Sequence, residues 1–127
     1  MGEAIRVLLV EDNQVFREAL ELLLGLRSDM EVVASVPDGA HAAAAAAAVR
    51  PDVVLMDSRL PGLDGVQATR AVREACPSAA VVCLTASATL RERDALTEAG
   101  VVACLRKDDG LDAVVAANPG AAQTRTA

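Results

Sequence analysis

The sequence predicts an α/β fold, a doubly wound five-stranded parallel sheet with helices on both faces, and three observations lead to that prediction. Short apolar runs without polar alternation recur along the chain, which is typical of parallel strands buried on both sides. Segments with helical character separate these runs, so that strand and helix alternate five times. A chain of 127 residues is also long enough to bury a core without disulfide or metal staples. We therefore expect one domain with right-handed crossovers.

The expected elements follow one another in regular alternation from the amino terminus. Four runs rich in Val and Leu are expected to be strands, and a weaker run that ends at Pro37-Asp38-Gly39 suits a sheet edge. The expected strands are residues 5–10, 31–36, 53–56, 80–84 and 101–105, and the expected helices are residues 13–26, 39–49, 64–76, 88–99 and 109–117.

Each of the first three helices has a pattern of its own. Apolar residues recur at helical spacing on one face of the first and the third, at Phe16, Leu20, Leu23 and Leu24 and at Ala68, Ala71, Val72 and Ala75. The second contains seven consecutive Ala, which favours a helix over disorder. His41, the single histidine, has no second His or Cys beside it, so we expect a solvated helix residue rather than a metal ligand.

Composition excludes several classes of function. The formal net charge is −6 and gives no electrostatic footprint for nucleic acid, so this segment is not expected to contact DNA directly. The absence of Trp and Tyr excludes stacking of bases or flavin rings on those side chains. No apolar run approaches ~18 residues and no signal-peptide layout is present, so we expect a cytoplasmic chain without a membrane partner. The three cysteines are expected to be small buried hydrophobes in a reducing compartment.

The residues just after the apolar runs carry most of the functional information, because ligands of open α/β sheets bind outside the carboxyl ends of the strands. Glu11 and Asp12 come after the first run, and Asp57 comes after the third. Thr85 comes after the fourth run, and Lys107, the single lysine of the chain, lies just beyond the fifth. If the first and third strands are neighbours, the three carboxylates converge.

Three convergent carboxylates would repel one another, at a cost of about 4 kcal/mol for each pair ~4 Å apart. Proton uptake or a divalent cation relieves that repulsion, and oxygen ligands of this kind suit Mg²⁺. A carboxylate beside Mg²⁺, with a hydroxyl and an ammonium group nearby, has the parts for phosphoryl transfer to an aspartate. Asp57 would then be the nucleophile, while Lys107 and Thr85 would stabilise the transferred group.

Each residue also has a simpler explanation. Asp12 is a candidate N-cap of the first helix, and Asp57 is a candidate turn former. Thr85 is a candidate cap of the fourth helix, and Asp64 is expected to cap the third. An isolated lysine is usually solvated surface. The phosphoryl-transfer interpretation is preferred because four of the five strands end in a group that one reaction needs.

At these residues the sequence resembles a bacterial response regulator receiver domain over about residues 4–117. The stretches that carry the resemblance are VLLVEDN (7–13), RPDVVLMD (50–57), LPGLDG (60–65), LTA (84–86) and LRKD (105–108). The resemblance implies a flavodoxin-like sheet with the strand order 2-1-3-4-5. It also implies that a sensor histidine kinase donates the phosphoryl group, and that the domain is not an enzyme beyond slow self-dephosphorylation at most. The residues that it assigns to the phosphoryl group are Asp57 (the phosphoacceptor), Thr85 and Lys107, and those that it assigns to Mg²⁺ are Glu11, Asp12, Asp57 and the backbone carbonyl of Arg59.

Lys107-Asp108, where many receivers have Lys-Pro, resembles the subfamily with a LuxR-type helix-turn-helix output domain. DNA would then be a partner only through an output domain absent from this chain, and a homodimer is a second candidate assembly. Two departures from the family bear on this expectation. Cys104 stands where the family usually has the Tyr or Phe of its switch, and Asn118-Pro119-Gly120 is expected to end the last helix early, which bears on the usual dimer face. We expect a receiver domain over residues 1–117 and a flexible tail or linker over 118–127.

Three other classes of protein share part of this pattern. A phosphatase of the haloacid dehalogenase type requires a second Asp two residues after the nucleophile, where this chain has Arg59. A flavodoxin-type electron carrier requires a phosphate loop where this chain has Glu11 and Asp12. A pseudo-receiver, an interaction module that works without phosphorylation, stays open as the alternative because of Cys104.

Overall fold

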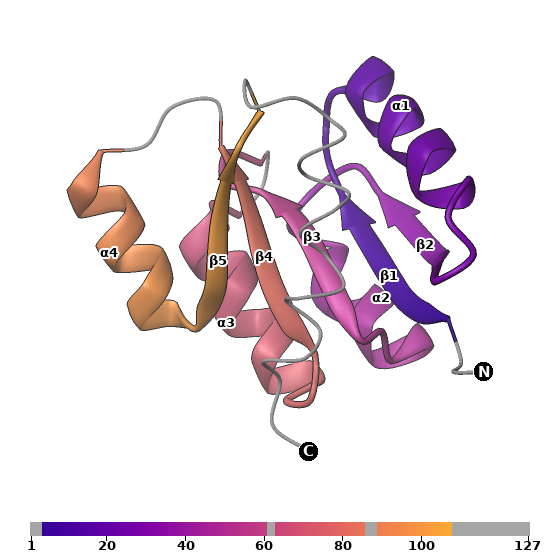
Figure 1. Ribbon diagram of the computed structural model, residues 1–127. Coiled ribbons are helices and arrows are strands. Elements are labelled where there is room, and N and C mark those ends of the chain that lie inside the picture. The colour runs from indigo at the N-terminus through magenta and orange to yellow at the C-terminus, as the bar shows by residue number, and fades with distance from the viewer. Residues whose placement is uncertain (1–3, 61–62, 86–88, 108–127) are drawn as a thin grey trace.

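The computed structural model describes residues 4–60, 63–85 and 89–107 of the chain. Within these residues, parallel strands form one five-stranded sheet in the order β2-β1-β3-β4-β5 (Figure 1). This confirms the predicted fold class and strand order. The strands are β1 (Ile5–Val10), β2 (Met30–Val36), β3 (Val53–Asp57), β4 (Ala80–Thr85) and β5 (Val101–Arg106), and the helices are α1 (Gln14–Gly25), α2 (Ala42–Val49), α3 (Gly65–Ala75) and α4 (Leu90–Ala99).

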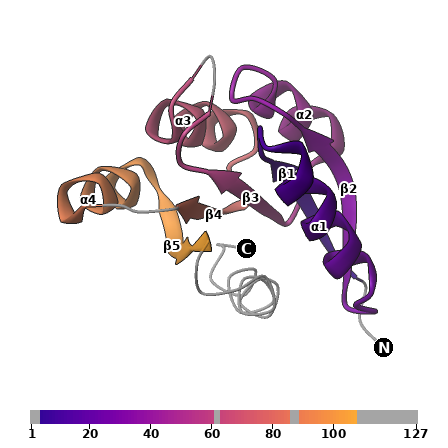
Figure 2. The same ribbon diagram turned by 90° about the horizontal axis from the view of Figure 1, so that it is seen from above.

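Helices cover both faces of the sheet, as Figure 2 shows. Residues of α2, α3 and α4 pack on one face in a cluster that includes Leu8 and Val54. Residues of α1 pack on the other face in a second cluster that includes Leu9 and Leu55. Successive residues of β1 and β3 therefore enter opposite cores, which explains why these strands show no polar alternation. The expected helix 109–117 and the expected tail 118–127 lie outside the described residues.

Side-chain caps fix where α1 and α3 begin. The Asn13 side chain accepts a hydrogen bond from the Phe16 amide at 3.0 Å, so Asn13 is the N-cap of α1. The alternative explanation of Asp12 as that cap is therefore wrong. Asp64 caps α3, as expected, and forms a reciprocal capping box with Gln67.

The starts of α2 and α4 differ from the expectation. Thr89 caps α4 by accepting a hydrogen bond from the Glu92 amide at 3.1 Å, so Thr85 is not the cap of this helix. In α2, the first helical residue comes after His41 rather than at Gly39. The Asp38 carboxylate accepts the His41 amide at 2.9 Å and lies 2.7 Å from Nδ1 of the exposed His41 ring, so a local turn precedes this helix.

The two strands at the edges of the sheet are less buried than the three between them. β2 lies at one edge, as its weaker apolar run predicted, and β5 lies at the other. Cys76 and Cys83 are buried free thiols, as expected, whereas Cys104 on β5 is only half-buried. No helix among the described residues is both long enough and apolar enough to cross a lipid bilayer.

Two glycines make close backbone contacts with the connection between β3 and α3. A Cβ atom on Gly65 would lie 2.8 Å from the Ser58 carbonyl oxygen, which already accepts the Gly65 amide at 3.0 Å. A Cβ atom on Gly39 would lie 2.7 Å from the Leu63 carbonyl oxygen. Neither position has room for a side chain, so these contacts fix the connection relative to α2 and α3.

Candidate functional site

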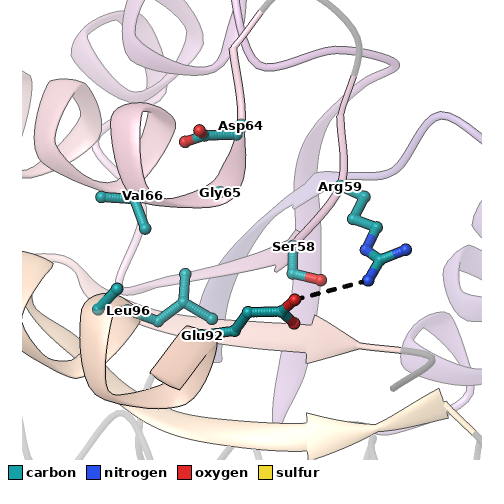
Figure 3. A pocket seen from close by; sticks show the side chains of 8 residues that line it. Ser58, Arg59, Asp64, Gly65, Val66, Glu92 and Leu96 are labelled. Carbon is teal, nitrogen blue, oxygen red and sulfur yellow. Dashed lines mark ion pairs between the residues drawn. The ribbon is translucent and has the colours of Figure 1, made fainter. Parts of the chain in front are cut away.

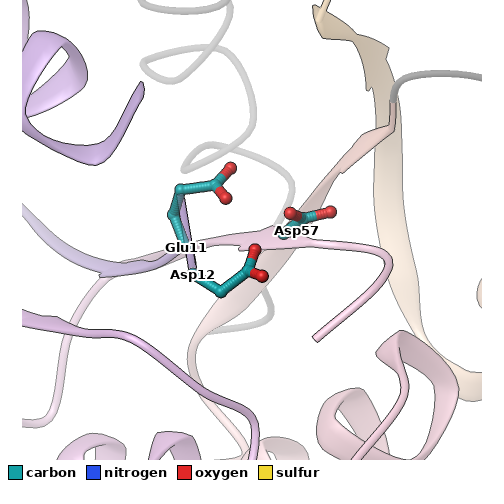
Figure 4. A group of neighbouring side chains, drawn as sticks. All are labelled: Glu11, Asp12 and Asp57. Carbon is teal, nitrogen blue, oxygen red and sulfur yellow. The ribbon is translucent and has the colours of Figure 1, made fainter. Parts of the chain in front are cut away.

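The carboxyl ends of β1, β3, β4 and β5 lie at the same edge of the sheet. β1 and β3 are adjacent parallel strands, as the expected convergence of carboxylates requires. Glu11, Asp12 and Asp57 each offer an oxygen atom, and these atoms lie within 4.8 Å of one another. Figure 4 shows Glu11 and Asp12 just after β1, with Asp57 beside them. The structure thus confirms that the three carboxylates converge.

Glu11 is the most buried of the three carboxylates, with no exposed surface. Its Oε2 atom accepts the Asn13 amide at 3.0 Å. The pKa of Glu11 is raised from 4.5 to about 7. Burial is the main cause and the nearby Asp57 adds to it, while the contacts with Lys107 and Asn13 act in the opposite direction. Keeping Glu11 charged therefore costs free energy in the folded protein, and a bound cation would lower that cost.

Lys107 connects two of the carboxylates. Its Nζ atom lies 2.7 Å from Glu11 Oε1 and 3.0 Å from Asp57 Oδ2, to which it donates a hydrogen bond. Although partial burial alone would lower it, the pKa of Lys107 is raised by its contacts with Glu11 and Asp57. The simpler explanation of this lysine as solvated surface is wrong, because its side chain is only 21% exposed and is held at the carboxylates.

Asp57 is the last residue of β3 and is almost fully buried. Its Oδ1 atom accepts the Arg59 amide at 3.0 Å, while Oδ2 faces Lys107. The first contact is that of a turn-forming aspartate, so the simpler explanation accounts for one oxygen of Asp57 but not for the other. The amide of Arg59 thus has a place in the site, and the role of its carbonyl as a metal ligand stays a prediction.

Thr85 is the last residue of β4 and is 2% exposed. Its hydroxyl is buried and has no hydrogen-bond partner among the residues that the structure describes. A buried polar group without a partner is costly, so the Thr85 hydroxyl is available to a ligand that reaches this edge of the sheet.

Three residues of α1 and its cap contribute to the site without having been singled out for it in the sequence. The backbone N–H of Asn13 donates a hydrogen bond to Glu11 Oε2, and the Arg17 side chain donates one to the Glu11 carbonyl oxygen at 2.7 Å. The Phe16 ring lies under the Lys107 ammonium, 4.6 Å from Nζ to the ring centre. Phe16 was expected to be a core residue because of its helical spacing with Leu20.

The sequence also matches a known protein family. The sequence profile of the response regulator receiver domain matches residues 7–118. The chain belongs to the response regulator receiver family. This agrees with the resemblance found in the sequence motifs.

Curated relatives of this receiver domain include transcriptional regulators. The transcriptional regulatory protein LnrK of Bacillus subtilis (strain 168) is 34% identical over 116 residues, which cover 89% of this chain and 51% of LnrK. The chain spans about half the length of the curated relatives it matches. The signal receiver domain of the NarL protein from Mycobacterium tuberculosis is 33% identical with a TM-score of 0.90, and the match covers 98% of this chain and all of that one.

The acidic edge of the receiver domain fits a divalent cation. Receiver domains bind Mg²⁺ at such a site, and one solved relative has magnesium coordinated in its active-site cleft. That relative, the receiver domain of the sensor histidine kinase PA1611 from Pseudomonas aeruginosa PAO1, is 32% identical with a TM-score of 0.76, and the match covers 95% of this chain and 99% of that one. In this chain three carboxylates offer hard oxygen ligands close together, and burial opposes the charge of Glu11.

Two cavities of the receiver domain adjoin the site. One of about 30 Å³ is lined by Thr85, Arg93, Cys104 and Arg106. The other, of about 270 Å³, lies between the start of α3, α4 and the loop after Asp57 (Figure 3). Arg59 Nη2 lies 3.8 Å from Glu92 Oε1 beside the larger cavity, and this exposed ion pair contributes little stability.

Proposed function

We propose that Asp57 of this receiver domain accepts a phosphoryl group from a sensor histidine kinase in a Mg²⁺-dependent transfer. The phosphorylated form would then switch a transcriptional output carried elsewhere in a longer protein. The observation that carries this proposal is the contact of the single lysine with Glu11 and Asp57, at the edge of the sheet where Asp12 also lies. The transcriptional regulators among the curated relatives support the proposed output.

The transfer would proceed by attack of an Asp57 carboxylate oxygen on the phosphorus of a phosphohistidine. An O–P bond forms while the P–N bond of the donor breaks, and the released imidazole takes up a proton from solvent. The Lys107 ammonium, already at Asp57 Oδ2, would neutralise charge on the transferred group. The buried Thr85 hydroxyl would donate a hydrogen bond to one phosphoryl oxygen.

Glu11, Asp12 and Asp57, with the backbone carbonyl of Arg59, are the residues that would hold Mg²⁺. The bound ion would supply positive charge that offsets the phosphoryl oxygens. Because Asp57 would itself accept the phosphoryl group, each domain would react once in a transfer and would not act as a turnover enzyme. Its own catalysis would be limited to slow self-dephosphorylation at most. DNA contacts would require a separate output domain, and a homodimer is a further assembly to test.

Incubation with acetyl phosphate and Mg²⁺, followed by intact mass measurement, tests the proposal. We expect one phosphoryl group on the wild-type chain and none on Asp57→Asn, because an amide is not a nucleophile. Asp64→Asn is the matched control, since Asp64 is exposed and Asn also caps helices, and it should be phosphorylated normally. Phosphorylation of Asp57→Asn at the wild-type extent would refute the assignment. An unmodified wild-type chain would instead favour an interaction module that works without phosphorylation.

A further inference from the structure

The single lysine of this chain rests on the ring of its single phenylalanine. The sequence contains one Phe, no Tyr and no Trp, and Lys107 is the only lysine. Lys107 Nζ lies 4.6 Å from the centre of the Phe16 ring, which is within the ~6 Å range of a cation–π interaction. The ammonium group therefore has three neighbours that favour its charge, namely Glu11, Asp57 and the face of this ring.

The Phe16 ring is held in place from two directions. The backbone N–H of Phe16 donates a hydrogen bond to Oδ1 of the N-cap residue Asn13 at 3.0 Å, which fixes Phe16 in the first turn of α1. Its half-buried side chain packs against the core cluster that contains Leu20 and Leu24. The ring is thus a fixed surface, whereas the lysine side chain is a flexible stem with many rotamers.

One of the two carboxylates that contact the Lys107 ammonium changes during the proposed reaction. Lys107 Nζ lies closer to Glu11 Oε1, at 2.7 Å, than to Asp57 Oδ2, at 3.0 Å. Asp57 changes its chemical form when it accepts a phosphoryl group, so its contact with the ammonium cannot stay the same throughout the reaction. The Phe16 ring takes no part in the chemistry and can hold the ammonium at this edge before and after transfer.

We propose that Phe16 is a positioning residue for phosphoryl transfer, which holds the Lys107 ammonium beside Asp57 through the face of its ring. The inference rests on the proposed function of Asp57 as phosphoacceptor. It differs from a purely structural role of Phe16 in one respect: the ring face, and not only its apolar volume, is required.

The unusual composition makes a direct spectroscopic test available. Lysine labelled with ¹³C at the ε carbon gives a single side-chain signal from Lys107, because the chain has no other lysine. The face of the Phe16 ring should shift the attached protons upfield. Phe16→Leu keeps an apolar side chain but removes the ring, so it should return the signal to the position of a lysine without a ring beside it. Phe16→Tyr should retain the upfield shift.

Phosphorylation rates then separate positioning from packing. With acetyl phosphate and saturating Mg²⁺, we expect Phe16→Leu to be phosphorylated about three- to tenfold more slowly than wild type, and Phe16→Tyr to be close to wild type. Leu23→Ala is the matched control, since Leu23 packs in the same cluster. It should lower the melting temperature without slowing phosphorylation of the folded protein.

Each outcome decides between the two proposals. An unshifted Lys107 signal in the wild type, or a wild-type rate in Phe16→Leu, would overturn the role of Phe16 while leaving Asp57 as phosphoacceptor. Equal slowing by Phe16→Leu and Leu23→Ala, with both proteins folded, would reduce Phe16 to a packing residue. A wild-type chain that accepts no phosphoryl group would overturn both proposals, whatever the Lys107 signal shows.

Discussion

Raising the pH without divalent cations should destabilise the folded chain through Glu11. The folded pKa of Glu11 is about 7, above the value of 4.5 that applies to an exposed side chain. Between these values the folded chain binds a proton that the unfolded chain has released, so the contribution of Glu11 to stability is greatest in acid and is lost as the pH rises through 7. At about 1.4 kcal/mol per pKa unit, the loss amounts to about 3 kcal/mol.

Urea unfolding followed by far-ultraviolet circular dichroism measures this effect at about pH 5, 6, 7 and 8 with a chelator present. Glu11→Gln supplies the comparison because the amide does not titrate. The loss of stability caused by placing the neutral Gln side chain beside Lys107 should be the same at each pH. The free energy of unfolding of the wild type, relative to Glu11→Gln, should therefore fall by up to about 3 kcal/mol between about pH 5 and pH 8.

Comparison of the two proteins removes the contributions of the groups that both contain, because the two chains differ only at residue 11. Added Mg²⁺ should stabilise the wild type more at about pH 8 than at about pH 5, because cation binding requires the charged carboxylate. Parallel pH profiles for the wild type and Glu11→Gln would refute the reasoning. So would a wild-type chain that gains stability relative to the variant as the pH rises.

Four further outcomes are expected. Millimolar Mg²⁺ should raise the melting temperature of the wild type by mass action, and Asp12→Ala should abolish most of that rise; an equal rise in both proteins would contradict the proposed ligand set. Lys107→Ala should keep the Mg²⁺-dependent rise in melting temperature but accumulate little phosphorylated protein by intact mass, and normal accumulation would remove Lys107 from the proposed mechanism. Asp64→Ala should lower the free energy of unfolding by about 1 kcal/mol through loss of the capping box, as measured in urea, while leaving phosphorylation unchanged. Beryllofluoride should shift the backbone amide signal of Thr85 strongly and those along β5 weakly, because Cys104 has no ring to move; equally large shifts along β5 would show that coupling to this strand does not need an aromatic residue.

The sheet and the convergence of its polar residues were predictable because both depend on periodic features of the sequence. Apolar runs identify strands buried on both sides, and the carboxyl ends of parallel strands must meet at one edge. Glu11, Asp12 and Asp57 therefore follow from their positions after β1 and β3. Neither the contact of Lys107 with two carboxylates nor the unsatisfied hydroxyl of Thr85 follows in this way, because both depend on the packing of side chains from separate strands.

Other features depended on local contacts that a periodic pattern does not contain. The start of α2 is set by hydrogen bonds between Asp38 and His41, which the Ala-rich sequence that follows does not reveal. Asn13 and Asp12 are both good N-caps by residue type, and only the bond to the Phe16 amide distinguishes them. The spacing of Phe16 with Leu20 correctly predicted a residue packed against the core. It could not show that the same ring also reaches Lys107.

The close contacts of Gly39 and Gly65 have a consequence for genetics. In a saturation mutagenesis screen scored by the proposed phosphorylation of Asp57, positions away from the carboxylates are expected to tolerate small residues such as Ala. Gly65 should not, because even a methyl group there would push on the carbonyl of Ser58, the residue bonded directly to Asp57. Loss-of-function alleles should therefore accumulate at Gly65 nearly as densely as at Asp57, and second-site revertants should arise in the connection between β3 and α3.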